Sequence, residues 1–398
     1  MNKKKVLLSI TVTSMIAVTG AVLAINGSLN SSSAFATNGE VWYHYAAVAP
    51  TSTRHGSKEF WASSTDGCNT HTFTDPGVAS IDRNFLDNEY SYSLTKEDDR
   101  YIAPTSSSPI INGDGETGDT VTYGIYPQTV LTDEELVSNL NNDAKEQTNG
   151  WFLYRGEYYA KVSATPYDSD YTFDNGTTIV EDTTYWFKCE PISWTILTDD
   201  YVDADGKHVG YYLLSDVLLD AHCYYDYSSA DYESEEYRTN NGVYNNNYEY
   251  SDIRSWLNDE FYNSAFAFGK SHIQTTAVDN SASTTDSNDN TYVCDNTEDK
   301  VFLPSYQDYL NSGYGFSTET YPDGARCCKL TDWAKARGAE YSHEEDENDY
   351  GDYWTRSPSS GDYDVASSVD YIGWVKPSWW AVAQACVCVH PALSIKIA

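Results

Sequence analysis

Apolar and polar positions alternate over long stretches of this chain, a pattern typical of strands in a sheet with one buried face. The alternation is clear at residues 120–131, 151–162, 185–197 and 207–215. Arg155-Gly156 and Asp205-Gly206 interrupt it with dipeptides that favour hairpin turns. Near the end, "WWAVAQACVCVHPALSIKI" again alternates small apolar residues with others. The pattern predicts a β-rich core with one or two closing strands.

Three segments have helical spacing and start at residues that cap helices. Thr132, with Glu135 three residues later, predicts a capping box at the start of a short helix. Ser251 precedes a segment, residues 251–266, whose apolar positions fall roughly on one face. Thr331 starts a third segment, and Gly338 ends it as a left-handed terminator. The polar residues 279–300 predict a surface loop.

Shifts in composition divide the chain into four parts. We predict a signal peptide at 1–36, a small β-rich module at 37–105, a Ser/Gly/Asp-rich linker at 106–119 and one large domain at 120–398. The predicted fold class is α+β, with a mixed, β-rich main domain that carries two or three short helices.

The first residues have the order of a secretory signal. Lys3, Lys4 and Lys5 precede an apolar run, and Ala34 and Ala36 form a cleavage pattern of small residues. An uncleaved membrane anchor is the competing interpretation, because the run approaches the ~20 residues that span a bilayer. Ser and Thr within the run and the cleavage pattern favour removal. We therefore expect a secreted, extracellular protein with no stable membrane span after cleavage, and attachment to the cell surface stays open.

The net charge of the chain limits the molecules that it can bind. Removal of the leader lowers Lys+Arg from 24 to 21 against 60 Asp+Glu, so the mature net charge is 21 − 60 = −39. Nucleic acids and anionic lipids need clustered basic residues to displace their counterions. The composition therefore excludes both as partners. The 11 Trp, 12 Phe and 35 Tyr supply ample apolar area for a folded core.

All eight cysteines follow the leader, an even number that permits disulfides of unassigned connectivity. The first module, which resembles an exported bacterial repeat of the form "WYHYAAVAPT…HGSKEFWA", also holds residues of the types that bind tetrahedral zinc. These are His44, His55, Cys68 and His71. Ordinary surface or core positions are the simpler interpretation, and we favour it. A structural zinc ion in this module stays open.

Eight motifs occur in the order expected of one family: "VTYGIYPQT", "YWFKCEPISWTIL", "LLSDVLLD", "SDIRSWLNDEFYNSAF", "DKVFLPSYQDYLNSGYGF", "TDWAKARGA", "YWTRSPSS" and "VHPALSIKI". On these motifs the chain, from about Thr120 to Ile397, resembles exported proteins of Gram-positive bacteria with the "domain of unknown function 6273". The resemblance implies no biochemical activity, because none is assigned to that family.

A second resemblance is to C-type-lectin-like folds, through an aromatic-x-Arg-Ser segment, a variable stretch and a closing strand that carries a proline. The formylglycine-generating enzymes share that fold. Where the "domain of unknown function 6273" proteins commonly end "GVRPAL", this chain has His390 in place of the arginine. The enzyme resemblance implies an alternative function, a copper- and thiol-dependent oxidase. Cys386 and Cys388 would supply its thiols, because alternation places both on one face of a strand.

Arg356 lies between Trp354 and Pro358 in the "YWTRSPSS" motif. An arginine in this setting can stack on an aromatic ring or bind a carboxylate through two hydrogen bonds. Catalytic neighbours are missing from the surrounding sequence, and acids are abundant. We therefore interpret Trp354, Arg356 and Pro358 as structural, with Arg356 as an internal tie to a carboxylate.

Residues 361–385 are rich in Tyr, Ser, Asp and Trp, as adaptable binding surfaces are. We predict ligand-binding residues at Tyr371, Trp374, Trp379 and Trp380. For the three tryptophans, ordinary core packing is the alternative. The partner would be an extracellular glycan or protein. If the chain is a target of a diversity-generating retroelement, this segment is the one that varies. The predicted function is a secreted, non-enzymatic ligand-binding or adhesion-type protein.

Overall fold

The computed structural model describes residues 108–147, 150–155, 157–226, 244–267, 269–342 and 349–397 with their side chains. Before residue 108 it describes the backbone of five strands. The chain forms two compact units. One consists of Met1–Ser107 with Leu153–Glu157, and the other of Ser108–Phe152 with Tyr158–Ala398.

The first unit contains one antiparallel sheet. Its strand order is β1 (Ile10–Thr11), β4 (Thr70–Phe73), β3 (Ser57–Ser64), β2 (Val41–Val48) and β5 (Ser93–Ile102). The predicted signal peptide lies outside the described residues, apart from β1.

The main sheet, which belongs mostly to the second unit, has nine strands. Seven follow one path: β17 (Val301–Phe302), β23 (Ala392–Ile395), β12 (His208–Ser215), β11 (Thr184–Val202), β10 (Glu157–Ser163), β9 (Phe152–Tyr154) and β8 (Lys145–Glu146). The other two are β7 (Thr120–Val130), which pairs with β11, and β6 (Ile110–Asn112), which pairs with β7. The β-rich core predicted from alternation is confirmed.

The hairpin between β11 and β12 forms where Asp205-Gly206 predicts it. Gly206 has a φ of +76°, and its N–H donates to the carbonyl of Asp203. Positive φ strains residues that carry a Cβ, so glycine suits this position. The closing strand β23 pairs with β12 on one side and β17 on the other, which ties the C-terminal segment into the main sheet.

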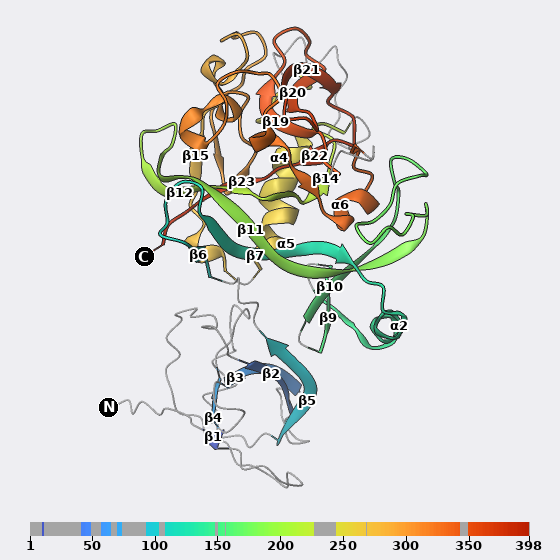
Figure 1. Cartoon of the computed structure of the whole chain (residues 1–398). Helices are drawn as coiled ribbons and strands as arrows, with labels where there is room; N and C mark the ends of the chain where they lie inside the picture. The colour runs from blue at the N-terminus through green and yellow to red at the C-terminus, as the bar shows by residue number, and fades with distance from the viewer. Residues whose placement is uncertain are drawn as a thin grey trace, which may run out of the picture. The chain divides into compact units, whose positions relative to one another are not determined.

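A second sheet of five strands lies above the long strands β7 and β11 in the view of Figure 1. Its order is β14 (Asp220–Ala221), β22 (Cys388–Val389), β19 (Tyr353–Pro358), β20 (Val365–Val369) and β21 (Val375–Ala381). The pairing of β19 with β22 is parallel and the others are antiparallel. Two small sheets complete the unit, formed by β13 (Val217–Leu218) with β18 (Lys329–Leu330) and by β15 (Thr276–Val278) with β16 (Thr297–Asp299).

Three helical segments accompany the sheets, in agreement with the α+β prediction for the described chain. They are α2 (Glu134–Asp143), α4 (Asp252–Trp256) continued by the π-helical turn η2 (Leu257–Phe261) and α5 (Tyr262–Ala265), and α6 (Asp332–Ala336). Short 3₁₀ turns lie at η3 (Lys270–His272), η4 (Ala282–Thr284), η5 (Asp308–Leu310), η6 (Ser312–Tyr314) and η7 (Gly324–Arg326). Within the described residues, no helix is both long and apolar enough to cross a membrane.

The predicted caps are confirmed for two helices and wrong for one. The hydroxyls of Ser251 and Thr331 accept from backbone N–H groups one turn into their helices. At α2 the cap is Asp133, whose carboxylate accepts from Glu135 and Leu136, so the Thr132 prediction is wrong by one residue. A carboxylate competes well for this position because it accepts two N–H groups at the positive end of the helix.

Aromatic side chains fill the space between the main sheet and the helices. Tyr126 of β7 packs against Phe261 with ring centroids 5.0 Å apart, and Phe187 of β11 packs edge-on against Trp333 of α6 at 5.2 Å. Such pairs each contribute about 0.5–1.5 kcal/mol beyond the burial of their surface. The core therefore sits between β7 and β11 on one side and η2 and α6 on the other.

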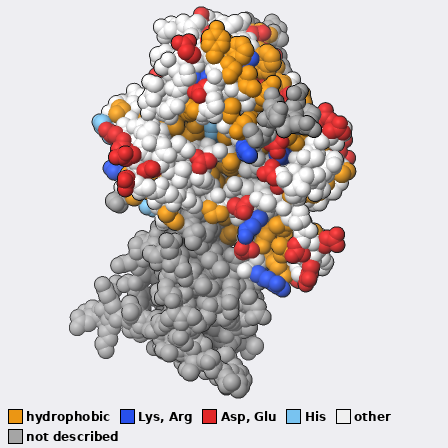
Figure 2. Space-filling view, in the orientation of Figure 1, with side chains coloured by type: hydrophobic (Ala, Val, Ile, Leu, Met, Phe, Trp, Pro, Cys, Tyr) orange, Lys and Arg blue, Asp and Glu red, His pale blue; other side chains and the backbone are white. Residues whose placement is uncertain are grey.

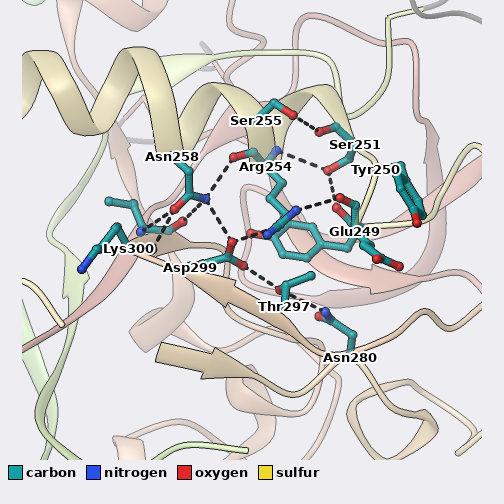
Figure 3. A network of polar contacts seen from close by, with 12 residues as sticks. Glu249, Tyr250, Ser251, Arg254, Ser255, Asn258, Asn280, Thr297, Asp299 and Lys300 are labelled. Atoms are coloured by element: carbon teal, nitrogen blue, oxygen red, sulfur yellow. Dashed lines mark hydrogen bonds and ion pairs between the residues drawn. The ribbon is translucent and has the colours of Figure 1, made fainter. Parts of the chain in front are cut away.

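The polar segment 279–300 differs from the prediction of a simple surface loop, because it enters a buried network (Figure 3). Asp299 at the end of β16 is buried and accepts from Arg254 Nε at 2.8 Å and from Thr297 Oγ1 at 2.7 Å. Asn258 Nδ2 donates to the same carboxylate at 3.3 Å. The network ties this segment to helix α4, and the hairpin β15–β16 closes its base.

Candidate functional site

The hairpin of β20 and β21 forms the free end of the second sheet, with β21 as its edge strand. Asp370 organises the turn between them. Its Oδ1 accepts from the N–H of Trp374 at 2.8 Å and of Ile372 at 3.2 Å. Gly373 completes the turn with a φ of +78°, and a Cβ there would come within 2.1 Å of the Asp323 carbonyl. Side chains on this hairpin are therefore held on an ordered backbone.

Large aromatic side chains surround this hairpin on the outside. Trp379 is 59% exposed, Tyr321 66% and Tyr371 37%, whereas Trp374 and Trp380 are half-buried. We call Tyr321, Tyr371, Trp374, Lys376 and Trp379 the aromatic surface. Figure 2 shows hydrophobic side chains gathered over β20 and β21 at this end of the unit.

A bulge in the edge strand explains why Trp379 reaches solvent. Ala366 pairs with Trp380, and Ser368 pairs with Lys376, so β21 contains two more residues than β20 between these pairs. Pro377 lies within the extra length and has no N–H to donate to a neighbouring strand. A bulge of this kind re-aims side chains, and here it leaves Trp379 outside the sheet.

Lys376 joins the two outer tryptophans. Its Nζ lies 3.6 Å from the centroid of the Trp374 ring and 4.6 Å from that of Trp379. The same ammonium is 3.2 Å from Asp370 Oδ2. Each cation–π contact contributes about 0.5–2 kcal/mol, more when water is excluded. Lys376 therefore orients the indoles and neutralises the aspartate of the turn.

Arg326 attaches Tyr321 to this hairpin, although the two are distant in sequence. Its guanidinium is buried and donates to the carbonyls of Ser317, Glu319, Tyr321 and Gly373 at 2.6–3.2 Å. Val375 N–H also donates to the Thr320 carbonyl at 2.9 Å. The loop 317–323 is thereby fixed beside the turn, and the Tyr321 and Trp374 rings lie 6.1 Å apart.

A buried carboxylate lies beneath the aromatic surface. Asp352 accepts from Trp380 Nε1 at 2.7 Å and from the N–H of Tyr371 at 2.8 Å. Burial raises the pKa of Asp352 to about 6, against the effect of these two hydrogen bonds. Burial, with the Asp352 charge added, raises the pKa of Glu340 to about 7.

The residues interpreted as structural lie inside the fold. Trp354 is buried and donates from Nε1 to the His222 carbonyl at 2.8 Å. Arg356 is buried and donates to Asp308 Oδ2 at 2.8 Å, to the Leu303 carbonyl at 2.9 Å and to the Asp279 carbonyl at 3.1 Å. Pro358 is buried at the end of β19. The contacts of Arg356 join β19 to segments that are 48–77 residues away in sequence.

His390 is buried against two tyrosine rings, with the Tyr353 ring 4.7 Å away. Its Nε2 donates to the Ser215 carbonyl at 2.7 Å, and Nδ1 lies 3.0 Å from the hydroxyl of Tyr309. Burial lowers the pKa of His390 to about 4, so the ring is neutral at pH 7. His390 is therefore an uncharged part of the core.

Cys386 and Cys388 do not alternate along one strand as the sequence suggests. Strand β22 begins at Cys388, and Cys386 lies in the preceding turn. Burial raises the pKa of Cys386 to about 12 and that of Cys388 well above its usual range. Thiols of this kind are poor nucleophiles and poor metal ligands at neutral pH, because both roles need the thiolate.

The candidate zinc ligands lie in the first module, outside the side chains that the structure describes. His55 and Cys68 lie outside the described residues, and His44 and His71 lie in β2 and β4, whose side chains are not described. In the part of the chain that is described, no three His, Cys, Asp or Glu side chains are grouped so that they would hold a metal ion.

Sequence reasoning placed Tyr371, Trp374, Trp379 and Trp380 together, and the structure brings all four to one hairpin and its turn. It missed Tyr321, Arg326 and Lys376. Nothing in the spacing of the sequence connects a loop at 317–323 with a turn some fifty residues later. The Pro322-Asp323-Gly324 segment indicates a turn there, but not which neighbour it meets.

Comparison with known protein families gives a match to the C-terminal part of the chain. The family model described as "Domain of unknown function (DUF6273)" matches residues 193–397. This range is slightly more than half of the 398-residue chain and contains β12, β22, β23 and the whole β20–β21 hairpin. It is shorter than the range from Thr120 that the motifs suggest. No curated protein and no solved structure matches the chain significantly. The chain belongs to the DUF6273 family of domains of unknown function.

Proposed function

We propose that this chain is a secreted, non-enzymatic ligand-binding protein of the adhesion type, and that its aromatic surface binds an extracellular glycan or protein. The observation that carries the proposal is the position of Trp379. An indole that is 59% exposed, on a bulged edge strand and fixed by Lys376, contributes nothing evident to the core. Exposed aromatic anchors on a rigid backbone are typical of binding surfaces.

The proposal includes a C-type-lectin-like arrangement of the second unit. Its support is the location of the "YWTRSPSS" strand β19, which pairs in parallel with the closing segment at β22 and carries the β20–β21 hairpin on its other edge. Such a sheet presents one hairpin at its free end, while the closing strand β23 returns to the main sheet.

The same hairpin lies within residues 361–385, the segment proposed to vary in a retroelement-diversified protein. Ordered backbone contacts through Asp370 and Gly373 allow side chains on the outside to change without loss of the turn. A near-copy of this segment in neighbouring DNA that differs at adenines, beside a reverse transcriptase gene, would support diversification. Sequencing of that region decides the point.

The alternative, a copper- and thiol-dependent oxidase, has less support. Its thiols at Cys386 and Cys388 are buried and protonated at neutral pH, and they do not share a strand. A fold resemblance does not bring an activity with it.

A binding screen tests the proposed function. The full-length protein and its Trp379→Ala variant are applied to a glycan array and to intact cells, with Tyr250→Ala as the matched control. Tyr250 is 57% exposed and belongs to the loop before helix α4. We expect at least one partner that the wild type and the control bind and Trp379→Ala loses. Equal binding of all partners by the three proteins would contradict the proposal.

A further inference from the structure

The contacts of Lys376 show which chemistry the aromatic surface accommodates. Its ammonium lies over two indole rings, 3.6 and 4.6 Å from their centroids, and 3.2 Å from the Asp370 carboxylate. Aromatic faces combined with a carboxylate are the arrangement by which proteins hold ammonium groups. The surface thus already binds one organic cation, supplied by the chain itself.

Further ring area extends beyond the part that Lys376 covers. Tyr321 is more exposed than any other residue of the aromatic surface, and its ring continues the series from Trp379 through Lys376 to Trp374. Trp379 is also mostly exposed. These outer faces carry the negative side of the aromatic quadrupole, which attracts positive charge.

The charges around the rings are complementary to a cation. The segments 317–326 and 370–381 contain three acids, Glu319, Asp323 and Asp370, against two cations, Arg326 and Lys376. Lys376 is paired with Asp370, and Arg326 Nε lies 3.7 Å from Asp323, which leaves Glu319 exposed as the excess charge. The whole chain has a net charge of −36 and attracts cationic partners over longer distances.

The outer edge of β21 does not favour the addition of a further strand. The loop 317–323 already pairs with its start through the bond from Val375 to Thr320. Beyond that point Lys376, Pro377 and the bulge interrupt the edge, and these are the features by which proteins block strand addition. A partner therefore binds through its side chains rather than through a backbone ladder.

We propose that the partner of the aromatic surface is a segment of another protein that carries lysine or arginine, with its cations placed on Tyr321 and Trp379. This rests on the proposed function and narrows its partner from two classes to one. Electrostatic attraction speeds association, and ring contacts select the cationic side chains.

The test uses three probes on the full-length protein, measured by fluorescence anisotropy at 50 and 200 mM salt. They are a labelled peptide of alternating lysine and glycine, the same peptide with every lysine acetylated, and a labelled neutral β-linked hexose oligosaccharide. We expect the lysine peptide to bind, and both acetylation and Trp379→Ala to weaken it about 10-fold. Tyr321→Ala is expected to weaken it several-fold and Tyr250→Ala to leave it unchanged.

The outcomes separate this inference from the proposed function. Lysine-peptide binding of equal strength in wild type and Trp379→Ala reflects general attraction to an acidic protein and overturns the inference. Trp379-dependent binding of the acetylated peptide or the oligosaccharide overturns the cationic class and leaves the proposed function standing. If no probe binds in a Trp379-dependent way, the inference falls, and the glycan and cell screen then judges the proposed function alone.

Discussion

The indole Nε1 of Trp380 donates a 2.7 Å hydrogen bond to Asp352 Oδ2, and this bond connects the exposed hairpin with the interior of the second sheet. Asp352 belongs to the segment just before β19, whereas Trp380 lies on the edge strand β21. The carboxylate also holds the N–H of Tyr371. The buried carboxylate of Asp352 thus holds the Trp380 side chain on β21 and the backbone of Tyr371 in the turn before that strand.

The raised pKa of Asp352, about 6, predicts a pH dependence of stability. A carboxyl whose pKa is higher in the folded state stabilises the fold fully below its unfolded value of 3.8, and this contribution is lost as pH rises through 6. Relative to Asp352→Asn, the wild type should lose roughly 3 kcal/mol of unfolding free energy between pH 4 and 7. The variant also relieves the repulsion on Glu340, which acts in the same direction. Urea titrations at each pH measure the unfolding free energies of the wild type and of Asp352→Asn. The same dependence on pH in both proteins would contradict the prediction.

For His390 we expect the opposite dependence of stability on pH. Its pKa falls to about 4 in the folded state from 6.5, so the unfolded chain binds the extra proton between these values. The stability it contributes is complete above pH 6.5 and is lost as pH falls toward 4. Relative to His390→Gln, the wild type should lose roughly 3 kcal/mol between pH 7 and 4. The same titrations test it, and a histidine resonance that titrates near pH 6.5 in the folded protein and disappears in His390→Gln would refute it.

We expect removal of the Arg356 guanidinium to cause a large loss of stability. Arg356→Met removes three hydrogen bonds and leaves Asp308 without its ion pair, so we expect a loss of about 3–5 kcal/mol. Arg356→Lys should also destabilise, because an ammonium cannot reach three acceptors in the forked geometry of a guanidinium. Chemical denaturation measures both. The exposed Arg155→Met, which removes only a cation–π contact with Tyr154, is the control and is expected to change stability by no more than about 1 kcal/mol. A loss for Arg356→Met as small as that of the control would show that the tie is unimportant.

We expect the buried thiols of Cys386 and Cys388 to react slowly with alkylating reagents. In the folded protein at pH 8, iodoacetamide should modify Cys386 and Cys388 at least 10-fold more slowly than the half-exposed Cys327, as mapped by mass spectrometry. In urea the rates should become similar. The Cys386→Ala, Cys388→Ala double variant should keep partner binding. Rapid labelling of the folded protein, with copper binding and thiol oxidation, would instead support the oxidase.

Much of the framework follows from local sequence signals. The strands β7, β11 and β12, the turn at Gly206 and the caps at Ser251 and Thr331 all arise from patterns within a few residues. Alternation and helix capping each depend on residues only a few positions apart, so the sequence shows them directly. The cluster of Tyr371, Trp374, Trp379 and Trp380 is likewise local, since all four lie between positions 371 and 380, in one strand and the turn before it.

The remaining features depend on contacts that are distant in the sequence. Asp299 is buried because it meets Arg254 of another element, and nothing in the polar composition of 279–300 indicates this. Tyr321 joins the aromatic surface through the four carbonyl contacts of Arg326. The exposure of Trp379 depends on a bulge, which arises from pairing with β20 rather than from residue types alone.

The most direct test of the account compares one partner's affinity for two variants of the full-length protein. The partner is whichever molecule the wild type captures from the glycan and cell-surface screen, and the variants are Trp379→Ala and Tyr250→Ala. Both remove exposed aromatic rings, so both should fold with nearly wild-type circular dichroism and melting temperature. The account predicts an affinity at least 10-fold lower for Trp379→Ala and unchanged for Tyr250→Ala. Equal affinities would show that this indole, despite its exposure, is not where the protein recognises its partner.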